Sequence, residues 1–186
     1  MLIFIKMKKE LFQNIEIPEG VEASIEGTTI KIMGPEGENE RTFMINSLEF
    51  EKKDNKIIIG HKKATKKEKK LMNTLASHIR NMIIGVQKKF EYKLKVGFSH
   101  FPIKVELKEK EALIKNFLGE KIDRKSKIYN GVDVKIDKDI ITVSSVDKES
   151  AGQVAANFEI ATKIKGRDKR IFQDGIFIIN KAGKEI

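Results

Sequence analysis

Alternating apolar and polar positions predict two hairpins near the start of the chain. Residues 21–25 (VEASI) and 29–32 (TIKI) both alternate, and Gly27 and Thr28 between them are typical of a tight turn. Two further short apolar runs, LEF and KIIIG, flank an Asp-Asn pair and predict another hairpin over residues 48–60. The opening MLIFIKMKKELF lacks the basic region and small-residue cleavage site of a signal peptide, and we expect it to form a strand.

A helical period follows the second hairpin. Thr65 stands three residues before Glu68, which is the spacing of a capping box at a helix start. Gly85 is expected to end this helix, and residues 90–96 (FEYKLKV) alternate as the last strand of the unit. The predicted buried stripe of the helix consists of Leu71, Met72, Leu75, Ile79, Met82 and Ile83.

The same order of elements recurs in the second half of the chain. Residues 65–86 align with 146–167, and the strand-like stretches before them align too, so we infer a duplicated unit of roughly 80 residues. The predicted fold class is α+β, with two tandem repeats of a small antiparallel sheet packed against one helix. The expected domains are residues 1–97 and 98–186. The second repeat is predicted to contain strands at 103–107, 112–114, 132–136, 140–143 and 176–179, and a helix from about 148 to 164 with Asp147 as its cap.

Composition narrows the class of partner. The 186 residues carry a net charge of +10, with a sequence pI of about 9.6, so the surface attracts polyanions. Nucleic acid is the commonest polyanion and an anionic membrane is the rival, but no apolar run approaches the roughly 18 residues of a spanning helix. The absence of cysteine excludes disulfides and thiolate metal sites, and a cytoplasmic location is the default expectation.

Catalytic and metal-binding motifs are weak in this sequence. His61, His78 and His100 show no metal-ligand spacing with one another or with carboxylates, and no phosphate-binding glycine motif or serine elbow occurs. The loop 34–37 (GPEG) has the letters of a KH-domain clamp, but it lies between strands beside acidic residues, which favours a simple tight turn. We therefore expect no catalytic residue, no metal and no cofactor.

Three basic segments are candidates for nucleic-acid contact. Residues 62–70 and 121–127 are each equally well explained as solvated surface or as phosphate contacts. Residues 163–170 follow a predicted helix end, where cations complement the helix dipole, yet closely spaced arginines in a glycine-led loop exceed what the dipole requires. Only 7% of residues are aromatic, so folded RNA bound through phosphates and shape is favoured over stacked single strands.

Two residues next to the last basic segment have structural interpretations. Phe172 is expected to anchor the segment to the core rather than to stack on a base, and Asp174 with Gly175 is expected to form a turn into the last strand. Gly166 and Gly175 are expected to let the backbone approach RNA closely.

The end of the chain resembles a known family. The pattern R-x-F-x-D-G at Arg170, Phe172, Asp174 and Gly175 is similar to the signature of large ribosomal subunit protein six, in the form shared by archaea and eukaryotes. The stretches IPEGVEASIEG, HIRNMIIGV, FEYKLKVGFSHFP, NFLGEK and AANFEIATKIKGRD agree with that resemblance. Lys169 stands where many relatives have proline, and residues 1–12 and 182–186 match less clearly.

The resemblance implies a structural rRNA-binding protein rather than an enzyme. Such a protein has two sheet-plus-helix domains and binds large-subunit rRNA mainly through the second. It lies near the base of the stalk where translational GTPases dock, beside the sarcin–ricin loop and neighbouring ribosomal proteins, with no membrane or small-molecule substrate. The rRNA-binding residues expected on this chain are Lys163, Lys165, Arg167, Lys169, Arg170 and Gln173, with Arg124 and Lys125 assisting and Lys66, Lys67 and Lys70 contributing from the first domain.

Two other classes stay open at the level of sequence. One is an RNA-processing or RNA-modifying enzyme with two basic domains, and the other is an adaptor whose basic faces meet acidic protein partners.

Overall fold

The structure is a computed structural model that describes residues 9–43 and 48–186. The chain divides into two compact units, Met1–Lys88 and Lys89–Ile186. A strand was expected over the first twelve residues. Residues 1–8 lie outside the described part, and a strand begins at Lys9. No helix in the described ranges is both long and apolar enough to cross a membrane.

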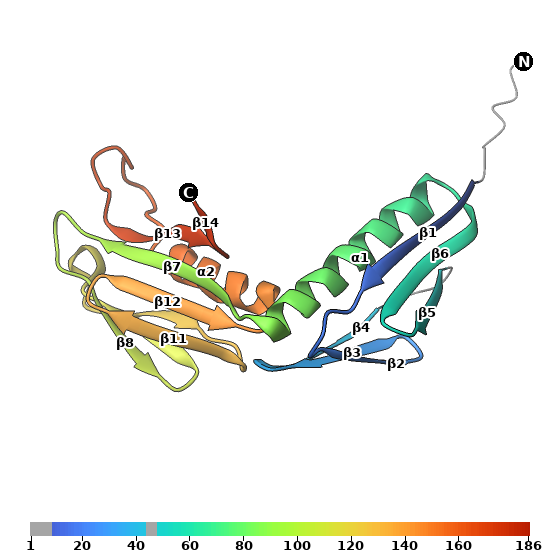
Figure 1. Ribbon diagram of the computed structural model, residues 1–186. Helices are drawn as coiled ribbons and strands as arrows, with labels where there is room; N and C mark the ends of the chain where they lie inside the picture. The colour runs from blue at the N-terminus through green and yellow to red at the C-terminus, as the bar shows by residue number, and fades with distance from the viewer. Residues whose placement is uncertain (1–8, 44–47) are drawn as a thin grey trace, which may run out of the picture. The chain divides into compact units, whose positions relative to one another are not determined.

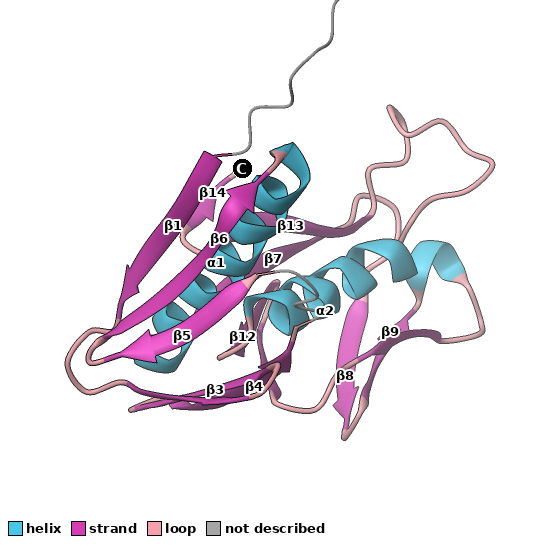
Figure 2. Ribbon diagram, turned by 90° about the vertical axis from the view of Figure 1, so that its right-hand side faces the viewer, coloured by secondary structure: helices cyan, strands magenta, loops and turns pink. Residues whose placement is uncertain are grey.

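The first unit combines two small antiparallel sheets with one helix. Its elements are β1 (Lys9–Glu16), β2 (Glu22–Glu26), β3 (Thr29–Gly34), β4 (Gly37–Thr42), β5 (Glu49–Lys53), β6 (Lys56–Ala64) and α1 (Lys66–Gln87). The described strands pair in the orders β1-β6-β5 and β2-β3-β4. Figure 2 shows α1 lying along β1 and β6, and α1 also contacts β3 and β4. Both predicted hairpins are confirmed, whereas β4 (GENERT) was not predicted because it contains no apolar alternation.

The predicted start of α1 is confirmed and its predicted end is wrong. Hydrogen bonds from the side chain and backbone of Thr65 complete the capping box and lower the pKa of Glu68 to about 2. The stripe is buried except for Leu71, which is 44% exposed. The helix continues past Gly85 to Gln87, because the turn between β3 and β4 packs against its last turn. There the Glu36 amide donates to the Val86 carbonyl at 2.9 Å.

The second unit has the same elements with two strands added. It contains β7 (Phe90–Gly97), β8 (Lys104–Lys108), β9 (Glu111–Lys115), a short 3₁₀ turn (Phe117–Gly119), β10 (Arg124–Lys127), β11 (Val132–Asp137), β12 (Ile140–Ser145), α2 (Lys148–Ala161), β13 (Gly175–Lys181) and β14 (Lys184–Glu185). The strands pair in the orders β11-β12-β7-β13-β14 and β10-β9-β8. Asp147 caps α2 as predicted, by accepting from the Glu149 and Ser150 amides.

The pairing order confirms the duplication and moves its boundary. The order β1-β6-β5 corresponds to β7-β12-β11, and β2-β3-β4 corresponds to β8-β9-β10. Strand β7 is therefore the first strand of the second repeat, paired with β12 and β13, and not the last strand of the first. The division falls after Lys88 and differs from the boundary expected after residue 97. Alternation identifies a strand but not its partner, so the sequence could not separate these possibilities.

The added strands follow a long connection at the end of α2. The helix stops at Ala161, before the expected residue 164. At this point the Thr162 hydroxyl donates to the Phe158 carbonyl at 3.2 Å and accepts from the Ile176 amide at 2.9 Å. Thr162 thus joins the helix end to β13. The connection of residues 162–174 and strands β13 and β14 have no counterpart in the described part of the first unit.

Candidate nucleic-acid interface

We call residues 162–174 the basic loop, which leaves the end of α2 and returns to β13 (Figure 1). The predicted cations Lys163, Lys165, Arg167, Lys169 and Arg170 are all in it and all exposed. Cations after a helix end are favoured by the negative pole of the helix dipole. The structure therefore brings these five side chains together on one segment.

Arg124 fixes the start of the basic loop from β10. Its Nη1 donates to the carbonyls of Ala161 at 2.9 Å and Lys163 at 3.4 Å. Its Nε and Nη2 form a fork with the Glu120 carboxylate, at 2.7 and 2.5 Å. The guanidinium also lies 4.3 Å from the centre of the Phe117 ring. Arg124 therefore points against the protein. Within the basic segment 121–127, Arg124–Lys127 is strand β10, which was not predicted.

Asp174 fixes the other end of the basic loop. Its carboxylate is 1% exposed and accepts from the Ser99 amide at 2.6 Å, the His100 amide at 3.0 Å and His100 Nδ1 at 2.6 Å. Burial alone would raise the pKa of Asp174, but the hydrogen bonds from His100 and Ser99 outweigh it and lower the pKa to about 2. The expected turn at Asp174 and Gly175 is wrong, because Gly175 is already the first residue of β13, and Asp174 instead anchors the end of the loop.

Ser99, His100 and Asp174 do not form a catalytic triad. Ser99 Oγ lies 3.0 Å from His100 Nδ1, and Asp174 Oδ2 lies 2.6 Å from the same nitrogen. A triad needs the hydroxyl and the carboxylate on opposite ring nitrogens, because one nitrogen takes the proton while the other is held. Within residues 9–43 and 48–186 no cluster of three or more potential metal-ligating side chains occurs.

Phe172 ties the middle of the basic loop to its anchor. Its half-buried ring stacks on His100 at a centroid distance of 4.8 Å, and the Arg167 guanidinium lies 4.7 Å from the ring centre. Phe172 thus holds the loop against His100 and is not part of the buried core. Arg167 is held in place by a cation–π contact that leaves its hydrogen-bond donors available.

The charged residues of the basic loop differ in whether they are already paired. Arg170 donates through Nε and Nη2 to Asp168, and this pair lowers the pKa of Asp168. In the part of the chain that the structure describes, no ion pair involves Lys163, Lys165, Arg167 or Lys169. We call these four residues the unpaired cations. They are the strongest candidates for contacts with an external anion.

The other predicted site residues lie apart from the unpaired cations or have partners. Lys125 pairs with Glu111 at 3.1 Å, and Gln173 donates to the Arg170 carbonyl at 3.2 Å. Lys66, Lys67 and Lys70 are exposed in the first turns of α1, in the other unit. A shallow depression of about 580 Å³ on α1 is lined by Lys66, Lys69, Lys70, Asn73, Thr74, Ser77, His78 and Asn81.

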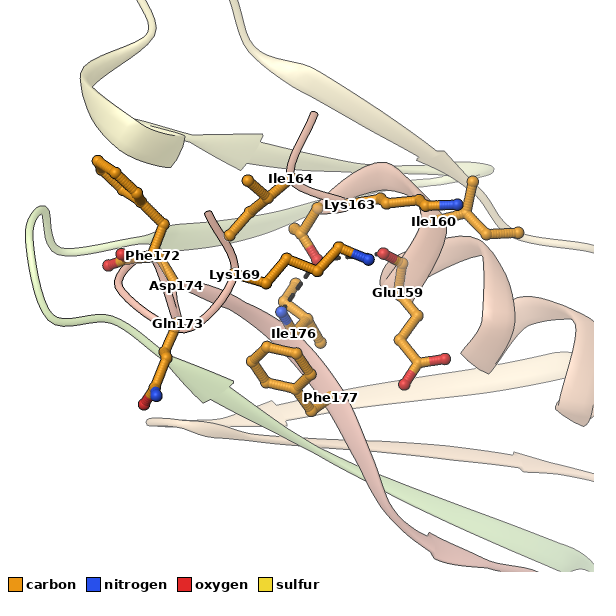
Figure 3. A pocket seen from close by; sticks show the side chains of 11 residues that line it. Glu159, Ile160, Lys163, Ile164, Lys169, Phe172, Gln173, Asp174, Ile176 and Phe177 are labelled. Atoms are coloured by element: carbon orange, nitrogen blue, oxygen red, sulfur yellow. Dashed lines mark hydrogen bonds between the residues drawn. The ribbon is translucent and has the colours of Figure 1, made fainter. Parts of the chain in front are cut away.

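A cavity beneath the basic loop was not predicted. It has a volume of about 630 Å³, and Figure 3 shows side chains of α2, the basic loop and β13 around it. Phe177 lies in this cavity and is 48% exposed. We expected both glycines to let the backbone approach RNA. Gly175 is buried below the Phe177 ring, so this expectation is wrong for Gly175. Gly166 is exposed, with a φ of +68°. The alternation of IFII could have indicated that Phe177 faces away from Ile176, but not that a cavity exists.

These features define a two-unit α+β protein whose second unit presents an anchored cationic loop, as suits a protein that binds a polyanion.

Comparison with known proteins gives the family. The family model described as ribosomal protein L6 matches residues 17–89 and 101–175. The chain is 43% identical over 176 residues to large ribosomal subunit protein uL6 of Methanosarcina mazei, covering 95% of this chain and 100% of the relative. It is 41% identical over 175 residues to large ribosomal subunit protein uL6 of Methanothrix thermoacetophila, covering 94% and 99%. The chain belongs to the ribosomal protein L6 family, which confirms the resemblance seen in its sequence.

Replacing Arg124 by lysine is expected to destabilise the second unit. An ammonium group keeps the charge but cannot make the fork to Glu120 and the bond to the Ala161 carbonyl together, so we expect the free energy of unfolding to fall by about 1–2 kcal/mol. The two tyrosines, Tyr92 and Tyr129, both lie in the second unit and there is no tryptophan, so tyrosine fluorescence during urea unfolding reports this unit. Lys125→Ala, which removes an exposed pair, should cost less than about 0.5 kcal/mol. An Arg124→Lys protein as stable as wild type would show that Arg124 is not an anchor.

Replacing Asp174 by asparagine is expected to loosen the other end of the basic loop. The depressed pKa of Asp174 contributes stability that is complete above its unfolded pKa of 3.8 and is lost as the pH falls towards about 2. At neutral pH we expect Asp174→Asn to lower the free energy of unfolding by about 2 kcal/mol. The variant should also lose less stability than wild type between about pH 4 and pH 2. Asp133→Asn, at an exposed ion pair, is the matched control. Equal pH profiles for wild type and Asp174→Asn would contradict the anchoring role.

Proposed function

We propose that this protein binds large-subunit rRNA mainly through the basic loop of its second unit, near the base of the stalk. As a member of the ribosomal protein L6 family, the chain is a structural protein of the large ribosomal subunit and not an enzyme. The observation that carries the proposed contact is the set of unpaired cations on a loop anchored at both ends.

The anchoring matters because ordering a loop costs free energy on binding. A chain segment that is already fixed loses less conformational entropy when it meets RNA. Arg124 and Asp174 therefore support binding indirectly by holding the loop, and we move Arg124 from the predicted contact residues to this positioning role. Arg170 can reach a phosphate by exchanging the Asp168 carboxylate for it. Gln173 lies in the basic loop, and Lys125 lies in β10, paired with Glu111.

The finer location rests on the family resemblance seen in the sequence. We infer that the second unit lies beside the sarcin–ricin loop, with neighbouring ribosomal proteins at the stalk base and translational GTPases docking nearby. Lys66, Lys67 and Lys70 then make a lesser contact from the first unit or face the solvent and the factors. The exposure of all three lysines supports either role.

Neutralising the unpaired cations is expected to reduce rRNA affinity and its salt dependence together. On B-form duplex DNA, each phosphate contact adds about −0.9 to the slope of log affinity against log salt concentration. With a slope of that order, four contacts correspond to a loss of affinity on the order of a hundredfold between 50 and 200 mM salt. We expect a variant with glutamine at Lys163, Lys165, Arg167 and Lys169 to lose most of this slope in binding to large-subunit rRNA.

A charge-matched variant controls for net charge. Glutamine at Lys104, Lys108, Lys110 and Lys135 removes the same charge from exposed lysines of the same unit outside the basic loop. This control should keep most of the wild-type slope. If both variants lose the same slope, diffuse charge and not the basic loop carries the binding.

Site-directed cleavage tests the location. The chain has no cysteine, so Lys165→Cys creates a single attachment point for a tethered iron chelate. In reconstituted large subunits we expect hydroxyl-radical cleavage of rRNA near the sarcin–ricin loop, and none with the treated cysteine-free parent. Strong cleavage only at distant rRNA would refute the stalk-base location while leaving rRNA contact intact. No rRNA cleavage at all would refute the contact of the basic loop.

A further inference from the structure

The cavity beneath the basic loop has the size and lining of a ligand site. Its volume of about 630 Å³ falls within the range of about 300–1,000 Å³ that is typical of small-molecule pockets. Its lining includes the apolar side chains of Ile160, Ile164, Phe172 and Phe177. Ile160 is 64% exposed and Phe177 is 48% exposed. A mostly apolar lining with a few polar groups is typical of a ligand site.

The Phe177 ring is a preformed flat platform in this cavity. A Cβ atom built on Gly175 would lie 3.0 Å from Phe177 Cζ, and one on Gly97 would lie 3.8 Å from Phe177 Cε2. The ring therefore lies against the backbones of two glycines on neighbouring strands, and a side chain at residue 175 would displace it. Gly175 has no positive φ, so room for this ring explains the glycine better than backbone conformation does.

The charges around the cavity favour a nucleotide over an apolar peptide. Lys163 and Lys169 line the same cavity, and Figure 3 shows their side chains crossing it above Phe177. Both belong to the unpaired cations. Of the two carboxylates in the lining, Asp174 is occupied by His100, so Glu159 alone faces two ammonium groups. An apolar side chain in the cavity would therefore bury a net positive charge, which is costly. A nucleotide brings its own phosphates, so that its base meets the ring and its backbone meets the lysines.

We propose that this cavity binds one unstacked base of the rRNA, with the base face on Phe177 and the flanking phosphates on Lys163 and Lys169. The inference rests on the proposed function, since the base belongs to the same RNA. Base–aromatic stacking accepts any base, but Glu159 lines the cavity and adds a preference. Glu159 Oε1 accepts from the Ile178 amide at 3.3 Å, and a carboxylate accepts but does not donate. Guanine presents two adjacent donors, N1–H and its amino group, to a carboxylate and is favoured most, whereas the single N3–H of uracil lies between two carbonyl oxygens and is favoured least.

Methyl NMR of the full chain tests the base directly. With isoleucine methyl groups labelled, the probes are the four ribonucleoside 5′-monophosphates, with ribose 5-phosphate as the base-free control. A bound base should shift the methyl signals of Ile160 and Ile164, which line the cavity, through its ring current, most for guanosine monophosphate and least for uridine monophosphate. Ile30 and Ile59, in the core of the first unit, should not move. Equal shifts with ribose 5-phosphate, or no shift with any nucleotide, would overturn the base site.

A pair of variants ties the effect to the ring. Phe177→Leu keeps an apolar side chain but removes the flat face, and should weaken nucleotide binding about tenfold. Phe12→Leu is the control, because Phe12 is 45% exposed and also lies against a glycine, Gly60, but in the first unit. Tyrosine fluorescence checks that the second unit of Phe177→Leu stays folded. Equal nucleotide affinity for Phe177→Leu and wild type would overturn the proposal.

Binding to large-subunit rRNA separates this inference from the proposed function. If wild type and Phe177→Leu both bind rRNA equally well with the full salt slope, the base site is wrong and the phosphate contacts of the basic loop stand. If wild type shows no binding to large-subunit rRNA, the proposed function itself fails.

Discussion

The cationic surface of this protein depends on two hydrogen-bonded anchors. Arg124 joins the end of α2 to β10 through carbonyl oxygens and Glu120, and Asp174 joins the start of β13 to Ser99 and His100. Without them the thirteen residues from Thr162 to Asp174 would be a free connection between a helix and a strand. With both ends fixed, and with Phe172 stacked on His100, the unpaired cations keep defined positions before any RNA arrives.

The duplicated fold explains why, among the described residues, the basic loop occurs in the second unit only. Both units share the same order of paired strands and the same covering helix. In the second unit, β13 adds to the edge of β7, and the chain must cross from the helix to reach that edge. The basic loop is that crossing. An extra strand has therefore supplied both the loop that carries charge and the ring of Phe177 beneath it.

Local patterns in the sequence predicted what local physics decides. The Thr65–Glu68 capping box, both hairpins of the first unit and the Asp147 cap depend on residues close in the chain, and all are present. The partners of β7, the inward orientation of Arg124 and the cavity at Phe177 depend on residues far apart in sequence, which no single segment reveals. Positive charge located the basic segment, but only the three-dimensional structure distinguishes Arg170, which is paired with Asp168, from the unpaired cations.

The most direct test of the account is the structure of the large ribosomal subunit with this protein bound. If the basic loop binds rRNA, the side chains of Lys163, Lys165, Arg167 and Lys169 lie within hydrogen-bonding distance of rRNA phosphate oxygens, while Arg124 stays on Glu120 and Asp174 stays on His100. A basic loop that faces solvent in the assembled subunit, or pairs with carboxylates of a neighbouring protein, would contradict it.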